Sequence, residues 1–135
     1  MKREELVALA CEAMDRAYAP YSRFRVGAAL LTKSGKVYQG CNIENAAYGP
    51  SNCAERTAFF QAIYEGEREF SAIAIVGGLE GEIRGFTAPC GVCRQVMQEF
   101  CKPDFEIHLW DGNAYQTYTL GNLLPLGFSA ENISE

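Results

Sequence analysis

Two short stretches of the chain carry side chains that can bind a metal and move protons. Cys53 is followed two positions later by Glu55, and residues 89–93 read Pro-Cys-Gly-Val-Cys. Cys53, Cys90 and Cys93 together offer three thiolates. Three protein ligands and one open position for water are typical of a catalytic zinc site. Zinc lowers the pKa of such a water, and a neighbouring carboxylate such as Glu55 can shuttle its proton.

The spacing of these residues leaves other interpretations open. The pair Cys90 and Cys93 could be half of a structural zinc site or a redox dithiol. A closed structural site usually needs a second such pair, and the sequence has none. Glu55 could instead complete a capping box with Asn52, three positions earlier. The only histidine, His108, alternates with apolar residues as in a strand and is not expected to be a ligand.

Arg56 is predicted to tune the charge of the zinc site. Three thiolates (−3) and one Zn²⁺ (+2) leave a net charge of −1, which weakens the metal as a Lewis acid. A guanidinium that donates hydrogen bonds to a thiolate sulfur withdraws part of this charge. Arg56 directly follows Glu55 at the start of the same expected helix. The alternative is an ordinary solvated helix arginine.

Hydrophobic spacing predicts the elements that position these residues. Apolar residues at three- and four-residue intervals predict helices over 4–18, over 53–65, and from Cys90 to the stop at Pro103. Strands are expected over 24–31, 37–41, 71–76, 105–109 and 115–119, with a short helical turn over 120–124. This order predicts an α/β fold, a three-layer α/β/α sandwich with a mixed sheet of about five strands.

Length, charge and cysteine content restrict the class of protein. The 135 residues are expected to form a single domain, residues 1–135. No apolar run reaches the about 18 residues of a membrane span, and the charged residues 1–5 do not suggest a secretion signal. A net charge of −5 argues against nucleic-acid partners, which need clustered basic residues. The six cysteines suggest reduced thiols in the cytoplasm.

Taken together, the motifs of this chain resemble the small cytidine deaminases. The resemblance covers nearly the whole chain in order and spacing. It rests on Tyr-Ser-x-Phe-x-Val-Gly-Ala-Ala at 21–29, Gly-x-Asn-Ile-Glu-Asn-Ala at 40–46, Cys-Ala-Glu-Arg at 53–56, Pro-Cys-Gly-x-Cys-Arg-Gln at 89–95 and Leu-Leu-Pro-x-x-Phe at 123–128. Either cysteine motif alone would be much less specific than the set.

The resemblance implies a zinc-dependent hydrolase of pyrimidine salvage. It would convert cytidine and deoxycytidine to uridine and deoxyuridine with release of ammonia. Cys53, Cys90 and Cys93 would bind one zinc ion per subunit. Glu55 would take a proton from the bound water, pass it to the ring nitrogen as hydroxide adds at the amino-bearing carbon, and then protonate the leaving amine.

The resemblance also implies how the nucleoside is held. Asn42 and Glu44 match the pair that binds the ribose hydroxyl. Phe24 matches the aromatic residue packed against the base, and the backbone N–H of Ala54 would hold the ring carbonyl.

An all-cysteine ligand set matches the homotetrameric branch of the family. In that branch, residues matching Ala46, Tyr48 and Phe128 reach the pocket of a neighbouring subunit. A homotetramer with active sites completed by neighbouring subunits is therefore implied.

Alternative functions follow from the same zinc chemistry. Related enzymes edit bases in RNA and DNA, but an acidic chain lacks the basic surface that polynucleotides require. A deaminase of a related nucleoside antibiotic and a non-catalytic, zinc-stabilised binding module remain as alternatives.

Overall fold

A computed structural model describes residues 1–134 of the chain. Within them five strands form one sheet in the order β2-β1-β3-β4-β5. β1 pairs antiparallel with β2 and β3, β3 pairs parallel with β4, and β4 pairs antiparallel with β5. The predicted mixed sheet is confirmed. The strands are β1 (Phe24–Thr32), β2 (Val37–Cys41), β3 (Phe70–Leu79), β4 (Glu106–Trp110) and β5 (Tyr115–Thr119).

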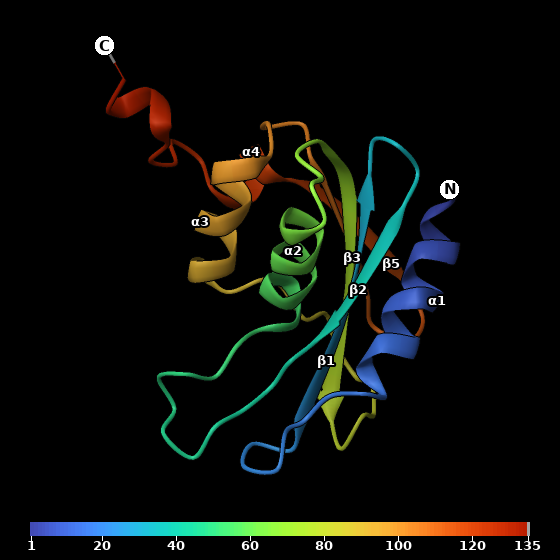
Figure 1. The fold of residues 1–135 in the computed structure, drawn as a ribbon. Helices are drawn as coiled ribbons and strands as arrows, with labels where there is room; N and C mark the ends of the chain where they lie inside the picture. The colour runs from blue at the N-terminus through green and yellow to red at the C-terminus, as the bar shows by residue number, and fades with distance from the viewer. Residues whose placement is uncertain (135) are drawn as a thin grey trace.

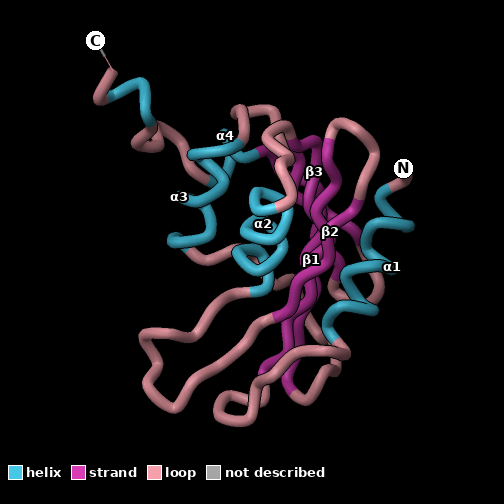
Figure 2. The backbone as a smooth tube through the Cα atoms, in the orientation of Figure 1, coloured by secondary structure: helices cyan, strands magenta, loops and turns pink. Residues whose placement is uncertain are grey.

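Helices cover both faces of this sheet, as Figure 1 shows. α1 (Arg3–Met14) lies on one face, and α2 (Ala54–Tyr64) and α3 (Gly91–Phe100) lie on the other. The short helices α4 (Leu120–Leu123) and η1 (Ala130–Asn132) follow β5. Figure 2 shows the strands as a single layer between the helices, which confirms the predicted three-layer sandwich. None of the helices within residues 1–134 is long and apolar enough to cross a membrane.

The first helix ends four residues earlier than predicted, at Met14. The chain beyond it pairs with the segment that follows β2. The Tyr18 N–H donates to the Asn42 carbonyl at 2.9 Å, and the Glu44 N–H donates to the Tyr18 carbonyl at 2.9 Å. These long-range bonds replace the helical ones and bring residues 19–24 beside Glu44.

β3 is the central strand and is buried on both faces, as its continuous apolar run predicted. It is longer than predicted because it continues through Gly77 and Gly78 to Leu79. Ile73 and Ile75 face the core beneath α2, where the Phe59 ring packs against three other aromatic rings (Phe70, Phe100 and Phe105). Ala72, Ala74 and Val76 face the core beneath α1.

Two glycines allow the helices to lie directly on the sheet. A Cβ atom at Gly27 would lie 2.0 Å from the Ala10 carbonyl oxygen of α1. A Cβ atom at Gly40 would lie 2.4 Å from the Ala54 carbonyl oxygen and 2.6 Å from the Ala58 nitrogen of α2. The beginning of α2 is therefore held against β2 by backbone contact.

We expect Gly40→Ala to lower the free energy of unfolding by about 1–3 kcal/mol, because the new methyl group overlaps helix backbone that cannot move cheaply. Chemical denaturation monitored by circular dichroism measures the change. Gly85→Ala is the control, since a Cβ there has no neighbour within 4 Å. Equal stability of the two variants would contradict the close approach of α2.

Candidate active site

α2 and α3 each begin directly after a cysteine. Cys53 is the N-cap residue of α2 and Cys90 that of α3, and both have extended backbone conformations. Cys93 lies in the first turn of α3, and its N–H points at the Cys90 sulfur at 3.5 Å. Figure 1 shows both helices starting at the same end of the sheet. Free N–H groups at a helix start favour thiolate over thiol.

The three sulfurs lie together. Their Sγ atoms are within 4.8 Å of one another, and those of Cys53 and Cys90 are 3.8 Å apart. In a tetrahedral site with Zn–S bonds of about 2.3 Å, two sulfurs are separated by about 3.8 Å. The donor set and its spacing therefore fit zinc. The other three cysteines, Cys11, Cys41 and Cys101, are free and are not part of this cluster.

Arg56 supplies positive charge to the sulfurs. Its Nη2 donates to the Cys53 Sγ at 3.2 Å, and its Nε is buried without a hydrogen-bond partner among the described residues. Hydrogen bonds from Cys93 and from Arg56 lower the pKa of Cys53 to about 5, and the contact with Cys93 has the larger effect. Arg94 instead donates to the Pro89 and Leu123 carbonyls, at 2.7 and 2.8 Å.

Glu55 is buried, with 4% of its surface exposed. Burial raises the pKa of its carboxyl group to about 7. The capping-box interpretation is wrong, because Cys53 and not Asn52 is the N-cap residue. The Asn52 side chain donates instead to Thr57 Oγ1 at 3.2 Å.

A cavity of about 220 Å³ brings the predicted residues together. It joins the segment after β2, the start of α2 and the segment before α3. Its lining residues are Val26, Asn42, Glu44, Ser51, Asn52, Cys53, Ala54, Glu55, Thr87, Ala88 and Cys90. Five of these were not predicted as site residues (Val26, Ser51, Asn52, Thr87 and Ala88). Four of the five directly precede the two cysteine motifs. This position next to the motifs was the sequence signal that could have identified them as site residues.

Asn42 and Glu44 are fixed at one side of this cavity. The Asn42 amide accepts from the Val26 N–H at 2.9 Å and donates to the Phe24 carbonyl at 2.8 Å. The Glu44 carboxylate accepts from the Ser22 hydroxyl and from the backbone N–H groups of Tyr21 and Ser22. These bonds, the hydroxyl first, lower the pKa of Glu44. The site therefore presents a fixed amide beside a stable anion.

Phe24 does not line the cavity that contains the cysteines. It lies in an adjoining cavity of about 270 Å³, and Thr87 lines both cavities. A Cβ at Gly77 would lie 3.1 Å from the Phe24 ring and 2.8 Å from the Thr87 hydroxyl. Thr87 thus lies at the boundary between the cavity of Phe24 and the cavity of Cys53 and Cys90.

Ala46, Tyr48 and Phe128 also lie outside the cavity. Ala46 and Tyr48 belong to the loop between β2 and α2, which extends from the body of the molecule in Figure 1. Tyr48 is 79% exposed and Phe128 is 60% exposed. The Phe128 carbonyl accepts from Gln95 Nε2 at 2.9 Å, which ties the C-terminal segment to α3.

Comparison with known proteins places this site in a family. Residues 1–108 match the model of the cytidine and deoxycytidylate deaminase zinc-binding region. The chain is 48% identical to the cytidine deaminase of Sporosarcina psychrophila, over 99% of this chain and 96% of that protein. It is 49% identical to the cytidine deaminase of Halalkalibacterium halodurans, over the whole length of both.

Solved structures agree with the sequence comparisons. The crystal structure of cytidine deaminase from Burkholderia pseudomallei superimposes with a TM-score of 0.87 at 52% identity, covering 95% of this chain and all of that chain. The cytidine deaminase of Mycobacterium tuberculosis gives a TM-score of 0.82 at 38% identity, over 95% of this chain and 98% of that chain. On this evidence the chain belongs to the zinc-binding cytidine and deoxycytidylate deaminase family.

Proposed function

We propose that this protein is a zinc-dependent hydrolase that converts cytidine and deoxycytidine to uridine and deoxyuridine with release of ammonia. The observation that carries the proposal is one cavity that contains Cys53 and Cys90, two of three clustered sulfurs, together with the buried carboxyl group of Glu55. The relatives described above bear the name cytidine deaminase, and this favours neither a nucleoside-antibiotic deaminase nor a non-catalytic module.

Cys53, Cys90 and Cys93 would hold the zinc ion. When bound, zinc supplies a Lewis acid that lowers the pKa of a water molecule. Glu55 has a pKa of about 7, because it is buried, so its carboxyl group can both accept and release a proton near neutral pH. We infer that Glu55 takes one proton from the attacking water and delivers it to the ring nitrogen as the hydroxyl adds to the amino-bearing carbon. Glu55 then takes the proton of the added hydroxyl and passes it to the amine, which leaves as ammonia while the carbonyl forms.

Arg56 is proposed to set the charge at the sulfurs. Its hydrogen bond to Cys53 withdraws electron density from one of three clustered thiolates. This lessens their mutual repulsion and keeps the metal a stronger Lewis acid. The buried Nε without a partner among the described residues supports this role, because the guanidinium gives up one hydrogen bond while it donates to the sulfur.

The remaining residues of the site are proposed to bind the nucleoside. Ala54 is the first residue of α2, where the N–H has no partner within the helix and is free for the ring carbonyl. Asn42 and Glu44 would bind the sugar hydroxyl, and Phe24, reached past Thr87, would pack against the base. An anionic Glu44 attracts a hydroxyl and repels a phosphate, which favours free nucleosides over nucleotides and nucleic acids.

We further propose a homotetramer, formed by a single deaminase domain per chain, that works in pyrimidine salvage in the cytoplasm. Exposed apolar side chains on α2, α3 and the β2–α2 loop support an assembly, and they include Phe60, Val92 and Tyr48. Ala46, Tyr48 and Phe128 are proposed to complete a neighbouring site, since they lie outside the cavity of their own chain. Six free cysteines fit a reducing compartment.

Glu55→Gln tests the proposed chemistry. We expect ammonia release from cytidine to fall by about 100- to 10,000-fold, since the variant cannot carry a proton, while bound zinc is retained. Glu65→Gln, at the exposed far end of the same helix, is the control and is expected to keep full turnover. A binding module would show no turnover in the unmodified protein, and an active Glu55→Gln variant would contradict the role of this carboxyl group.

Arg56→Gln tests charge tuning. We expect kcat for cytidine to fall by about 10- to 100-fold and zinc to be lost to a chelator at a lower concentration, because one thiolate loses its charged donor. Zinc content by elemental analysis and steady-state rates measure both effects. Arg68→Gln is the control, because Arg68 is exposed, lines neither of the two cavities described above and bonds, within residues 1–134, only to the backbone carbonyls of Ile63 and Glu67. Unchanged zinc affinity and turnover in Arg56→Gln would refute the proposed role.

A mixing experiment tests the shared active sites. Sedimentation should give four times the 14.9 kDa mass of one chain. Glu55→Gln and Phe128→Ala chains, each of low activity alone, should regain activity when refolded together, because a mixed assembly contains some sites with both residues intact. A fully active monomer, or mixed chains no more active than the separate ones, would refute the arrangement.

A further inference from the structure

Ser22 has no role in the function proposed so far, yet it contacts two of the residues expected to bind the nucleoside. It lies in the turn of residues 19–23 between α1 and β1. We propose that Ser22 is a positioning residue that holds the Glu44 carboxylate and the Phe24 backbone in the geometry that recognises the sugar of the nucleoside. This inference rests on the proposed function and deepens it.

The contacts of Ser22 are directional. Its hydroxyl donates to Oε2 of Glu44, and its backbone N–H donates to Oε1 at 3.1 Å. The Tyr21 N–H donates to the same Oε1 at 3.0 Å. Because the single hydroxyl proton is used on Glu44, the Ser22 oxygen is free to accept from the Phe24 N–H, at 3.0 Å. One small side chain thereby links the two predicted ligand-binding residues.

These bonds leave Glu44 a restricted capacity to accept more. A carboxylate offers about four lone-pair sites, and the chain fills three of them. Glu44 lines the cavity, so the remaining site is available to a hydroxyl of a bound sugar. Glu44 is only half-buried, and its side chain would otherwise be free to change rotamer. The turn therefore fixes the position of the Glu44 carboxylate. It also limits how many further hydrogen bonds this carboxylate can accept.

The turn itself is braced from the opposite side. Arg23 adopts a left-handed conformation, with φ of 60°, which is unfavourable for a residue with a side chain. Its carbonyl accepts from the Glu80 N–H at 2.6 Å, and its guanidinium pairs with the Glu80 carboxylate at 3.3 Å. The Arg23 N–H also donates to the Ala19 carbonyl at 3.0 Å. The end of β3 thus fixes the turn, and the turn can fix Glu44.

The segment that carries Glu44 is joined to the same region by backbone bonds. The Glu44 N–H donates to the Tyr18 carbonyl, and the Tyr18 N–H donates to the Asn42 carbonyl. Figure 1 shows the turn before β1 and the loop after β2 at the same end of the sheet. Glu44 is therefore anchored through its main chain by Tyr18 and through its side chain by Ser22. Backbone bonds alone would leave the carboxylate undirected.

Ser22→Ala is the test, with cytidine and 2′,3′-dideoxycytidine as substrates of the zinc-loaded protein. We expect KM for cytidine to rise by about 5- to 10-fold with a smaller change in kcat, since Glu44 loses its hydroxyl donor. The dideoxynucleoside has no hydroxyl at positions 2′ and 3′, so its KM should not rise in the same way. The variant also loses the hydrogen bond from the Phe24 N–H to Ser22, and this loss affects both substrates equally. The ratio of the two KM values (the preference for cytidine over the dideoxynucleoside) therefore isolates the contribution of Glu44.

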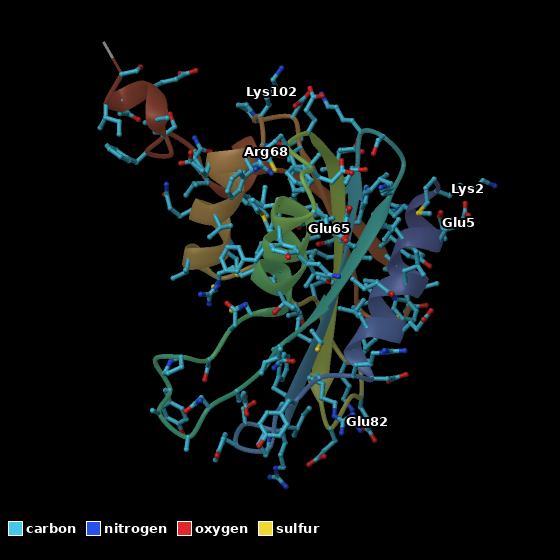
Figure 3. All side chains as sticks on the ribbon, viewed as in Figure 1. Lys2, Glu5, Glu65, Arg68, Glu82 and Lys102 are labelled. Atoms are coloured by element: carbon cyan, nitrogen blue, oxygen red, sulfur yellow. The ribbon has the colours of Figure 1, made fainter. Side chains whose placement is uncertain are left out.

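Two further variants make the test specific. Ser22→Thr keeps the hydroxyl and should restore the wild-type preference. Ser34→Ala is the matched control, because Ser34 Oγ also donates to a half-buried glutamate, Glu67, at 3.4 Å. That pair is next to Arg68, which Figure 3 shows at the opposite end of the molecule from Glu82, a residue of the cavity that contains Phe24. An unchanged preference in Ser22→Ala, or an equal change in Ser34→Ala, would overturn the proposal.

Calorimetry separates this inference from the proposed function. Binding of uridine and of 2′,3′-dideoxyuridine to the zinc-loaded wild type and to Ser22→Ala gives the same comparison without turnover. A protein that binds uridine in a Ser22-dependent way but releases no ammonia from cytidine would refute the proposed function and support the role of Ser22. Equal binding of both nucleosides by the wild type would overturn the role of Ser22 by itself.

Discussion

The clustering of three cysteine sulfurs is the constraint on which the rest of this structure depends. Thiolates a few ångströms apart would repel one another strongly, and the chain places groups of opposite polarity beside the sulfurs to offset this repulsion. Cys53 and Cys90 cap two helices, so the positive ends of both helix dipoles face the sulfurs. Arg56 adds a full positive charge at 3.2 Å from one of them. Both helices must therefore begin at one point in space.

The sheet and its packing fix that point. α2 follows β2 and α3 follows β3, and both helices return over the same face of the sheet. Gly40 lets the first turn of α2 rest on β2 through backbone contact, and the aromatic cluster around Phe59 fills the core further along α2. Rigid elements thus position the two capping cysteines together with Val26, Ala54 and Glu55, and the segments between elements supply the rest of the cavity lining. A site built in this way loses little entropy when it binds its ligands.

Local sequence patterns predicted much of this arrangement. The clearest failed prediction, the end of α1, depends on a contact between segments far apart in the chain. The apolar run of β3 and the two cysteine motifs are patterns of only a few neighbouring residues, and the sequence located both correctly. The end of α1 was wrong because Tyr18 pairs with the chain after β2, a contact between segments more than twenty residues apart. The capping box at Asn52 was wrong because α2 begins one residue later, with Cys53 at the N-cap position and the Asn52 side chain bonded to Thr57. Thr87 lies between Phe24 and the cysteines, and its position just before the second cysteine motif was the only sequence signal that marked it.

The two carboxyl groups of the cavity show how one site gives the same chemical group two functions. Glu55 is buried, and this raises its pKa to about 7, so it can exchange a proton in neutral solution. Glu44 is only half-buried and accepts hydrogen bonds from the Ser22 hydroxyl and two backbone N–H groups, which lower its pKa and favour the anion. A carboxylate that never protonates cannot serve as an acid, but it can accept a hydrogen bond from a sugar hydroxyl at any physiological pH. The difference lies in the surroundings and not in the residue type, so the turn that holds Glu44 matters to the site as much as the burial of Glu55.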